Sequence, residues 1–181
     1  MHTLEPASTG RSKCRACQLR IAKGAMRFGE RGLNPYGDGD ATFWFHPGCG
    51  ALKRPEAFAS LQKDPVLAAA VEPAHRDWAA AGVAAPRLAR LGGGQRAKSG
   101  RARCRSCGEL IEKGAWRVAI DIWEDGRFAP LGWLHAGCVL CYAQVDALGD
   151  VVERVLHFTL EGVDAQALRA ALSEATPAEL G

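Results

Sequence analysis

The sequence predicts an α+β fold of two small modules, each built from a short antiparallel sheet with flanking helices. Three observations support this fold class: an internal repeat, runs in which large apolar residues alternate with other residues, and downstream segments with helical spacing. Hydrophobic residues make up 48% of the 181 residues, which is typical of a globular protein. Half of such a chain builds only a modest core, and folds of that size commonly depend on a metal ion or on disulfides.

The repeat shows that the chain is a duplicated module. Its first part has an offset of 90 residues, and after a one-residue insertion or deletion it continues at an offset of 89. The matched segments are Cys14–Cys17 with Cys104–Cys107, Ile21–Arg27 with Ile111–Arg117, and Trp44–Cys49 with Trp133–Cys138. Between the copies, residues 79–94 are rich in Ala and Gly, a composition typical of a flexible linker. We therefore expect a first module with its C-terminal linker over residues 1–90 and a second module over residues 91–181.

Each module carries three cysteines and one histidine at a spacing typical of a zinc site. A C-x2-C pair is followed, after 28 or 27 residues, by H-x2-C. The predicted ligands are Cys14, Cys17, His46 and Cys49 in the first module and Cys104, Cys107, His135 and Cys138 in the second. Three thiolates and one imidazole close a tetrahedral shell and leave no position for a substrate water. We therefore expect two structural Zn2+ ions per chain and, since no catalytic motif accompanies them, a protein that is not an enzyme.

Cys141 offers an alternative, since it lies three residues beyond Cys138 and could replace His135 in an all-cysteine site. The repeat argues against this arrangement. Leu52 occupies the equivalent place in the first module, whereas His46 and His135 coincide. We therefore expect Cys141 to be a small buried residue on the helix that follows the site.

Alternation of large apolar residues predicts a strand after each C-x2-C pair. In residues 116–122 the large apolar side chains fall on even positions, which places Arg117 on the face away from the core. The same argument places Arg27 away from the core in the first module. The next strand carries Trp44 in one module and Trp133 in the other, and we expect both rings to pack in the core beside the metal.

Two longer segments have helical spacing, namely residues 50–70 and residues 141–156. Near the end of the chain, Asp164 is expected to cap the N-terminus of a last helix. This helix carries Leu168 and Leu172 four residues apart, on one face.

The net charge of +3 is distributed unevenly along the chain. Residues 1–54 carry a net charge of +5 and residues 86–117 of +7, whereas residues 55–85 carry −2 and residues 118–181 carry −7. The positive charge thus surrounds the two C-x2-C pairs. Such clustering is expected of a surface that binds a polyanion, although a solvated charged face is the plainer alternative.

No segment approaches the roughly 18 apolar residues of a membrane span, and the first ten residues lack the apolar run of a secretory signal. We therefore expect a cytoplasmic protein with no membrane partner, nucleoid-associated if the source is bacterial. In that compartment grouped cysteines indicate metal ligands rather than disulfides.

The second module resembles the zinc finger of the poly(ADP-ribose) polymerases, a finger that also stands at the start of DNA ligase III. The likeness rests on residues 97–107 (AKSGRARCRSC), on residues 111–114 (IEKG) and on a W-x-H-x-x-C ending. It covers nearly all of residues 96–175, and residues 10–75 resemble the family less closely. The resemblance implies fingers that recognise strand breaks and exposed duplex ends without reading their sequence.

The resemblance also assigns residues to DNA. Family arginines three residues before the first cysteine and ten after the second contact the DNA backbone, and these positions here are Arg11, Arg27, Arg101 and Arg117, with Lys98 in the same basic stretch. Family apolar side chains in the loop before the last strand stack on the base pair exposed at a break. That loop does not align residue by residue, so the candidates are Leu33 and Tyr36 in the first module and, in a loop over residues 123–131, Phe128 and Leu131 in the second. The alternative is that these side chains close onto their own domain.

We therefore predict a two-finger protein that binds DNA at nicks, gaps or ends, and that shields them or recruits a repair enzyme in trans. We expect it to lack the family's ADP-ribosyltransferase domain, and we expect the second module to dominate break recognition because it lies closer to the family pattern. The main alternative is a zinc-stabilised adaptor that binds another protein, and a nuclease is a more distant one. The basic clusters favour DNA, and the closed four-ligand shell disfavours metal catalysis.

Overall fold

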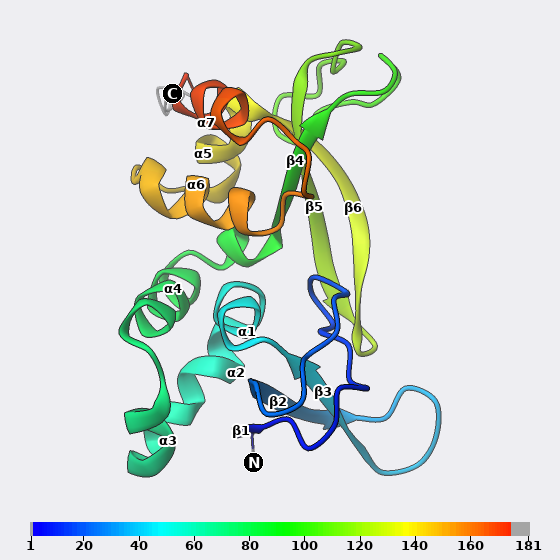
Figure 1. Cartoon of the computed structure of the whole chain (residues 1–181). Coiled ribbons are helices and arrows are strands. Elements are labelled where there is room, and N and C mark those ends of the chain that lie inside the picture. Colours follow the sequence, from blue (N-terminus) through cyan, green and yellow to red (C-terminus); the bar gives the residue numbers. More distant parts are fainter. Residues whose placement is uncertain (1, 175–181) are drawn as a thin grey trace. The chain divides into compact units, whose positions relative to one another are not determined.

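The computed structural model describes residues 2–174 and separates into two compact units (Figure 1). The first unit comprises residues 1–84 and 123–129, and the second comprises residues 85–122 and 130–181. Each contains a three-stranded antiparallel sheet and several short helices. The predicted α+β fold class is therefore confirmed.

The first unit has a sheet in the order β1-β2-β3. Its strands are β1 (Thr3–Pro6), β2 (Met26–Leu33) and β3 (Asp40–Phe45). Phe28 of β2 and Phe45 of β3 are opposite each other in the sheet register and are fully buried. Both rings belong to an aromatic cluster in which Phe58 packs against Phe28 at 5.1 Å between ring centroids. This cluster forms the core between one face of the sheet and the helices.

Prolines divide the helical part of the first unit into short segments. These are α1 (Pro47–Lys53), α2 (Pro55–Ala59), the 3₁₀ helix η1 (Ser60–Lys63), α3 (Pro65–Ala70) and α4 (Pro73–Ala84). Residues 50–70 are thus helical as expected, but in several short segments. Pro55 and Pro65 have no backbone N–H to continue a helix, but their fixed φ suits the first turn of a new one.

The second unit repeats the arrangement with a sheet in the order β4-β5-β6. The strands are β4 (Leu91–Arg96), β5 (Trp116–Glu124) and β6 (Arg127–His135), and the helical segments are η2 (Pro86–Arg90), η3 (Ala136–Cys138), α5 (Val139–Ala143), α6 (Leu148–His157) and α7 (Ala165–Ser173). The predicted cap is confirmed, because the Asp164 side chain accepts a hydrogen bond from the backbone N–H of Ala167. Leu168 and Leu172 are fully buried, as their spacing predicts.

The glycine-rich stretch at residues 92–94 belongs to strand β4 and is not a flexible linker. Helix α4 extends to Ala84, η2 follows, and β4 begins at Leu91. A Cβ atom at Gly93 would clash with the backbone of Phe158, and one at Gly94 would clash with Leu168. These glycines therefore allow close packing of the strand, which composition alone does not distinguish from a linker.

Replacing Gly93 by Ala is expected to destabilise the second unit by about 1–3 kcal/mol, because the new methyl group meets backbone that has no rotamer to change. Gly149→Ala is the matched control, since it lies in α6 with open space around the added Cβ. It should stabilise the helix by up to about 1 kcal/mol. Urea unfolding of the zinc-loaded variants measures both effects, and equal stabilities would contradict the packing role of Gly93.

A two-residue turn joins β5 and β6 in place of the loop expected over residues 123–131. Asp125 and Gly126 have φ values of 48° and 72°, as a type I′ hairpin turn requires, and Asp-Gly is a preferred pair for that turn. Phe128 and Leu131 consequently lie within β6. The corresponding connection in the first unit, residues 34–39, is a loop between β2 and β3.

Candidate zinc centres and basic surface

Each C-x2-C pair lies on a tight turn that is repeated in the two units. The backbone N–H of Gln18 donates to the carbonyl of Cys14 at 2.9 Å, and that of Gly108 donates to the carbonyl of Cys104 at 2.9 Å. Gln18 and Gly108 both adopt the left-handed conformation, with φ values of 63° and 79°. The turn brings both thiols of a pair into one cluster with the distant histidine and cysteine.

The first cluster consists of Cys14, Cys17, His46 and Cys49. His46 follows the end of β3, and Cys49 lies in the first turn of α1, so the histidine and the last cysteine approach from one side. The Nδ1 atom of His46 lies 3.4 Å from the sulfur of Cys17 and 4.0 Å from that of Cys49. Cys14 and Cys49 are buried.

The second cluster consists of Cys104, Cys107, His135 and Cys138. The Nδ1 atom of His135 lies 3.4 Å from the sulfur of Cys107 and 3.9 Å from that of Cys138. Its Nε2 atom lies 3.2 Å from the carbonyl oxygen of Leu110, and donation there leaves Nδ1 as the ligand atom. Here only Cys104 is buried, and Cys107 is exposed.

Backbone groups around Cys104 favour the thiolate that zinc requires. Burial alone would raise the pKa of this thiol, but hydrogen bonds from the backbone N–H groups of Cys107, His135 and Ser106 lower the pKa to about 7. The N–H groups of Ser106 and His135 each lie 3.4 Å from the Cys104 sulfur.

The geometry of both clusters fits a zinc ion. All four ligand atoms of each cluster lie within 4.8 Å of one another. With Zn–S bonds of about 2.3 Å and Zn–N bonds of about 2.0–2.1 Å, neighbouring atoms of a tetrahedral shell lie roughly 3.6–3.8 Å apart, close to the sulfur–nitrogen distances seen here. The chain therefore has two Cys3His clusters suited to two zinc ions.

Cys141 lies on α5 and is not part of the second cluster. Its expected burial is wrong, because the thiol is exposed. The helix has only five residues, and its buried positions are taken by Val139, Leu140 and Ala143. Cys141 is left on the opposite side.

An arginine stacked on a tryptophan lies on the sheet face away from the core in each unit. The Arg27 guanidinium lies 3.5 Å from the ring centroid of Trp44, and that of Arg117 lies 3.7 Å from the ring centroid of Trp133. These are distances of a cation–π contact. Both rings are half-buried. The expected place of the tryptophans in the core is therefore wrong. Consecutive residues of a strand point to opposite faces of the sheet, so Trp44 lies on the face away from the buried Phe45.

The two stacked arginines differ in what compensates their charge. The strand register pairs Glu5 with Arg27 and Gln95 with Arg117. Arg27 donates to the Glu5 carboxylate at 2.6 Å and to the Ser12 hydroxyl at 3.0 Å. Within residues 2–174, Arg117 has no ion-pair partner, its Nε makes no hydrogen bond, and burial lowers the pKa of its guanidinium. Arg117 is therefore a largely buried cation that an anionic ligand would stabilise.

The same contrast extends to other basic residues. In the first unit Arg31 pairs with Asp40 at 3.7 Å, and Arg54 pairs with Glu30 at 2.6 Å. In the described part of the chain, none of the basic side chains of residues 86–117 forms an ion pair. The +7 charge of that segment is thus not neutralised by neighbouring carboxylates.

A surface hollow adjoins each C-x2-C turn. In the first unit it measures about 360 Å3 and its lining includes Arg11, Lys13, Arg15 and Trp44. In the second unit it measures about 660 Å3 and its lining includes Arg103, Arg105, Ser106 and Trp133. The predicted contacts Lys98 and Arg101 are exposed on the segment that leads into the turn. Arg15 and Arg105 also line these hollows and were not predicted, although the repeat aligns them as it aligns the predicted arginines.

The four candidate stacking residues have different surroundings. Leu33 and Tyr36, at the β2–β3 loop, are 84% and 80% exposed. Phe128 is half-buried, with its ring 4.8 Å from that of Trp123, and Leu131 is half-buried in β6. Phe128 therefore packs onto the protein itself, whereas the side chains of Leu33 and Tyr36 are accessible to a ligand.

Curated proteins similar to the chain include two poly [ADP-ribose] polymerases, whereas no family model matches it. Poly [ADP-ribose] polymerase 1 from Oryza sativa subsp. japonica is 31% identical over 143 residues, and that from Danio rerio is 28% identical over 157 residues. Both clusters fit zinc fingers of the poly(ADP-ribose) polymerase type. The alignments cover 75% and 76% of this chain but 14% and 15% of the polymerases, so the chain spans about a seventh of the length of these relatives.

The helices described between residues 2 and 174 include none with the length and apolar character that crossing a membrane demands.

Proposed function

We propose that the chain consists of two tandem fingers of the poly(ADP-ribose) polymerase type, over residues 1–90 and 91–181, that bind DNA breaks and exposed duplex ends. One observation carries this proposal: each unit stacks an arginine on the tryptophan two residues before the zinc-binding histidine, beside a basic hollow. The protein would bind DNA without chemistry of its own, in the cytoplasm or on a bacterial nucleoid. It would shield ends or recruit a repair enzyme in trans.

Affinity in this proposal comes from phosphate contacts, which do not depend on base sequence. Arg11, Arg27, Arg101 and Arg117 supply these contacts, with Lys98 nearby. Neutralising about four to six phosphates would give a slope of roughly −4 to −5 for the logarithm of the binding constant against that of the salt concentration. The second finger contributes more of this affinity, because its arginines have no carboxylate partners in the described structure.

Selectivity for breaks comes from apolar side chains that stack on a base pair exposed at the break. Leu33 and Tyr36 are the better candidates, because their side chains are exposed beside a loop. Phe128 and Leu131 remain the candidates of the second finger, but both are half-buried in β6. The exposed pair favours the first finger as the reader of the break.

Leu33→Ala combined with Tyr36→Ala is expected to reduce the preference for nicked or blunt-ended DNA over closed circular DNA by about tenfold. Stacking of one base contributes roughly 1–3 kcal/mol, and about 1.4 kcal/mol corresponds to a factor of ten in affinity. Binding to closed circular DNA should stay unchanged, because the phosphate contacts remain. The matched control is Phe128→Ala with Leu131→Ala, and if only this pair abolishes the preference, the second finger is the reader.

A zinc-stabilised adaptor for another protein is the competing function. Titration of the wild-type protein with blunt-ended DNA at several salt concentrations separates the two. A salt-independent affinity, or no measurable binding to any DNA form, would favour the adaptor.

A further inference from the structure

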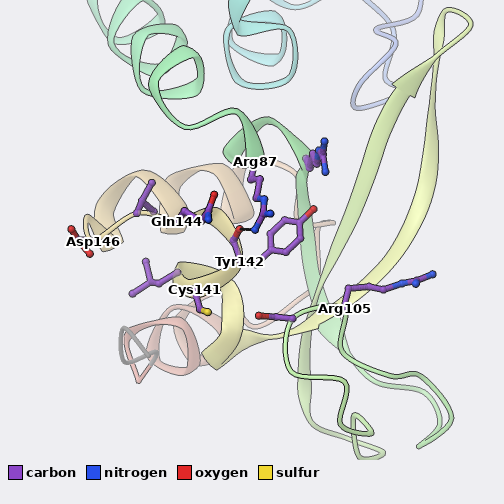
Figure 2. A pocket seen from close by; sticks show the side chains of 10 residues that line it. Arg87, Arg105, Cys141, Tyr142, Gln144 and Asp146 are labelled. Atoms are coloured by element: carbon purple, nitrogen blue, oxygen red, sulfur yellow. Dashed lines mark hydrogen bonds between the residues drawn. The ribbon is translucent and has the colours of Figure 1, made fainter. Parts of the chain in front are cut away.

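The second unit contains a hollow of about 550 Å3 that neither the zinc cluster nor the proposed phosphate contacts use (Figure 2). Arg87 and Arg90 of η2 form one side, Ser106 of the C-x2-C turn another, and Tyr142 and Gln144, in α5 and at its end, a third. This volume is typical of pockets for small ligands.

Arg87 is held by contacts with Tyr142 and keeps hydrogen-bond donors for an anion. One Nη atom of Arg87 donates to the backbone carbonyl of Tyr142 at 3.2 Å, and the guanidinium lies 5.5 Å from the Tyr142 ring centroid. This bond uses one of five N–H donors and leaves the others for a ligand. Neither Arg87 nor Arg90 has an ion-pair partner among residues 2–174, and the carboxylate of Asp146 points away from Arg87 in Figure 2.

The remaining walls suit a planar, partly apolar group. The Tyr142 ring, Leu140 and Val145 supply apolar surface beside the arginines. Gln144 ends α5 in the left-handed conformation, with φ of 58°. Gln144, whose side chain ends in an amide, also lines the hollow. The hollow thus combines cations and an amide with an aromatic wall.

The hollow adjoins the basic surface already described. Arg105 and Ser106 line both this hollow and the one that contains Trp133. The Arg105 side chain points away from Arg87 in Figure 2, and its Nε donates to the Leu131 carbonyl at 3.0 Å. The two hollows therefore meet at Arg105 and Ser106, beside the C-x2-C turn.

We propose that this hollow binds a nucleoside phosphate, presented by the phosphorylated terminus of a broken strand. The arginines bind the phosphate through charge-assisted hydrogen bonds, and the aromatic wall binds the base. That a strand terminus presents the ligand rests on the proposed function. The chemistry of the ligand rests on the residues that line the hollow.

Calorimetric titration of the full-length, zinc-loaded protein with adenosine monophosphate, adenosine and inorganic phosphate tests the ligand chemistry. The monophosphate should bind about tenfold more tightly than either part alone. Arg87→Ala and Arg90→Ala should each weaken it about tenfold, the effect of losing one hydrogen bond to a charged group. Arg96→Ala is the matched control, since Arg96 is exposed in the same unit, stacks on Trp116 at 4.1 Å and lies outside the hollow.

Blunt duplexes with 5′-phosphate, 3′-phosphate or hydroxyl ends test the source of the ligand. The wild-type protein should prefer phosphorylated ends, and Arg87→Ala should remove this preference without changing affinity for closed circular DNA. Nucleotide binding without any DNA binding would overturn the proposed function and leave the hollow as a site for a free nucleotide. Monophosphate binding no tighter than phosphate, an equal loss in Arg96→Ala, or equally tight binding of a polyglutamate peptide would overturn the inference.

Discussion

Chelation of zinc is expected to unfold both units and to abolish most of the helix and strand signal in circular dichroism. Each unit has a small core, and in small zinc folds metal binding contributes on the order of 10 kcal/mol of folding free energy. Elemental analysis of the native protein should return two zinc ions per chain, one for each Cys3His cluster. A single zinc ion, or an unchanged spectrum after chelation, would contradict this expectation.

Two variants in the second unit test the ligand set directly. His135→Ala should leave one zinc ion per chain, because it removes the imidazole from a cluster whose four ligand atoms lie within 4.8 Å of one another. Cys141→Ser should retain two zinc ions, since Cys141 is exposed on α5 outside that cluster. The reverse result would establish the all-cysteine site instead.

Gln95→Glu is expected to weaken DNA binding by about tenfold, and Glu5→Gln to strengthen it by a smaller factor. The sheet register pairs these positions with Arg117 and Arg27, so the two substitutions exchange the charge environments of equivalent arginines. A carboxylate at position 95 would compete with phosphate for Arg117, as Glu5 does for Arg27. A lost hydrogen bond to a charged group corresponds to about a factor of ten or more.

The measurement is affinity for a blunt-ended duplex over a series of salt concentrations. Gln95→Glu should reduce the salt slope by about one, because one phosphate contact is lost. Arg117→Ala should weaken binding at least as much, and adding Gln95→Glu to it should have little further effect, since both changes act on one contact. Independent, additive effects would show that residue 95 does not act through Arg117.

The repeat was sufficient to predict the two Cys3His clusters, because two copies of C-x2-C and H-x2-C share order, spacing and neighbours. Alternation likewise predicted the strand that carries Arg117. The glycines at 92–94 led to the wrong prediction of a flexible linker, since a strand that packs against the backbone of Phe158 has the same local composition as a linker. Their role depends on a contact with a residue more than 60 positions away.

The charge balance of the two stacked arginines also required the structure. Glu5 lies 22 residues from Arg27 in the sequence, and only the antiparallel register of β1 and β2 brings the two together. The surroundings of the stacking candidates were not predicted from the sequence, because Phe128 and Tyr36 are both aromatic residues that have a glycine and a proline within two positions. The signal that could have helped was the Asp125-Gly126 pair, which indicates a tight hairpin turn and places Phe128 in a strand.

Because its ligands are less buried, the second Cys3His cluster is expected to be the first to oxidise. Peroxide attacks thiolates that solvent reaches, and Cys107 is exposed, whereas Cys14 and Cys49 of the other cluster are buried. Damage would therefore proceed in sequence, with the second finger releasing its metal first. If the chain binds DNA as proposed, oxidation would weaken its contacts with phosphate, because the second unit carries the arginines without carboxylate partners in the described structure. Leu33 and Tyr36 would meanwhile stay on a folded first unit.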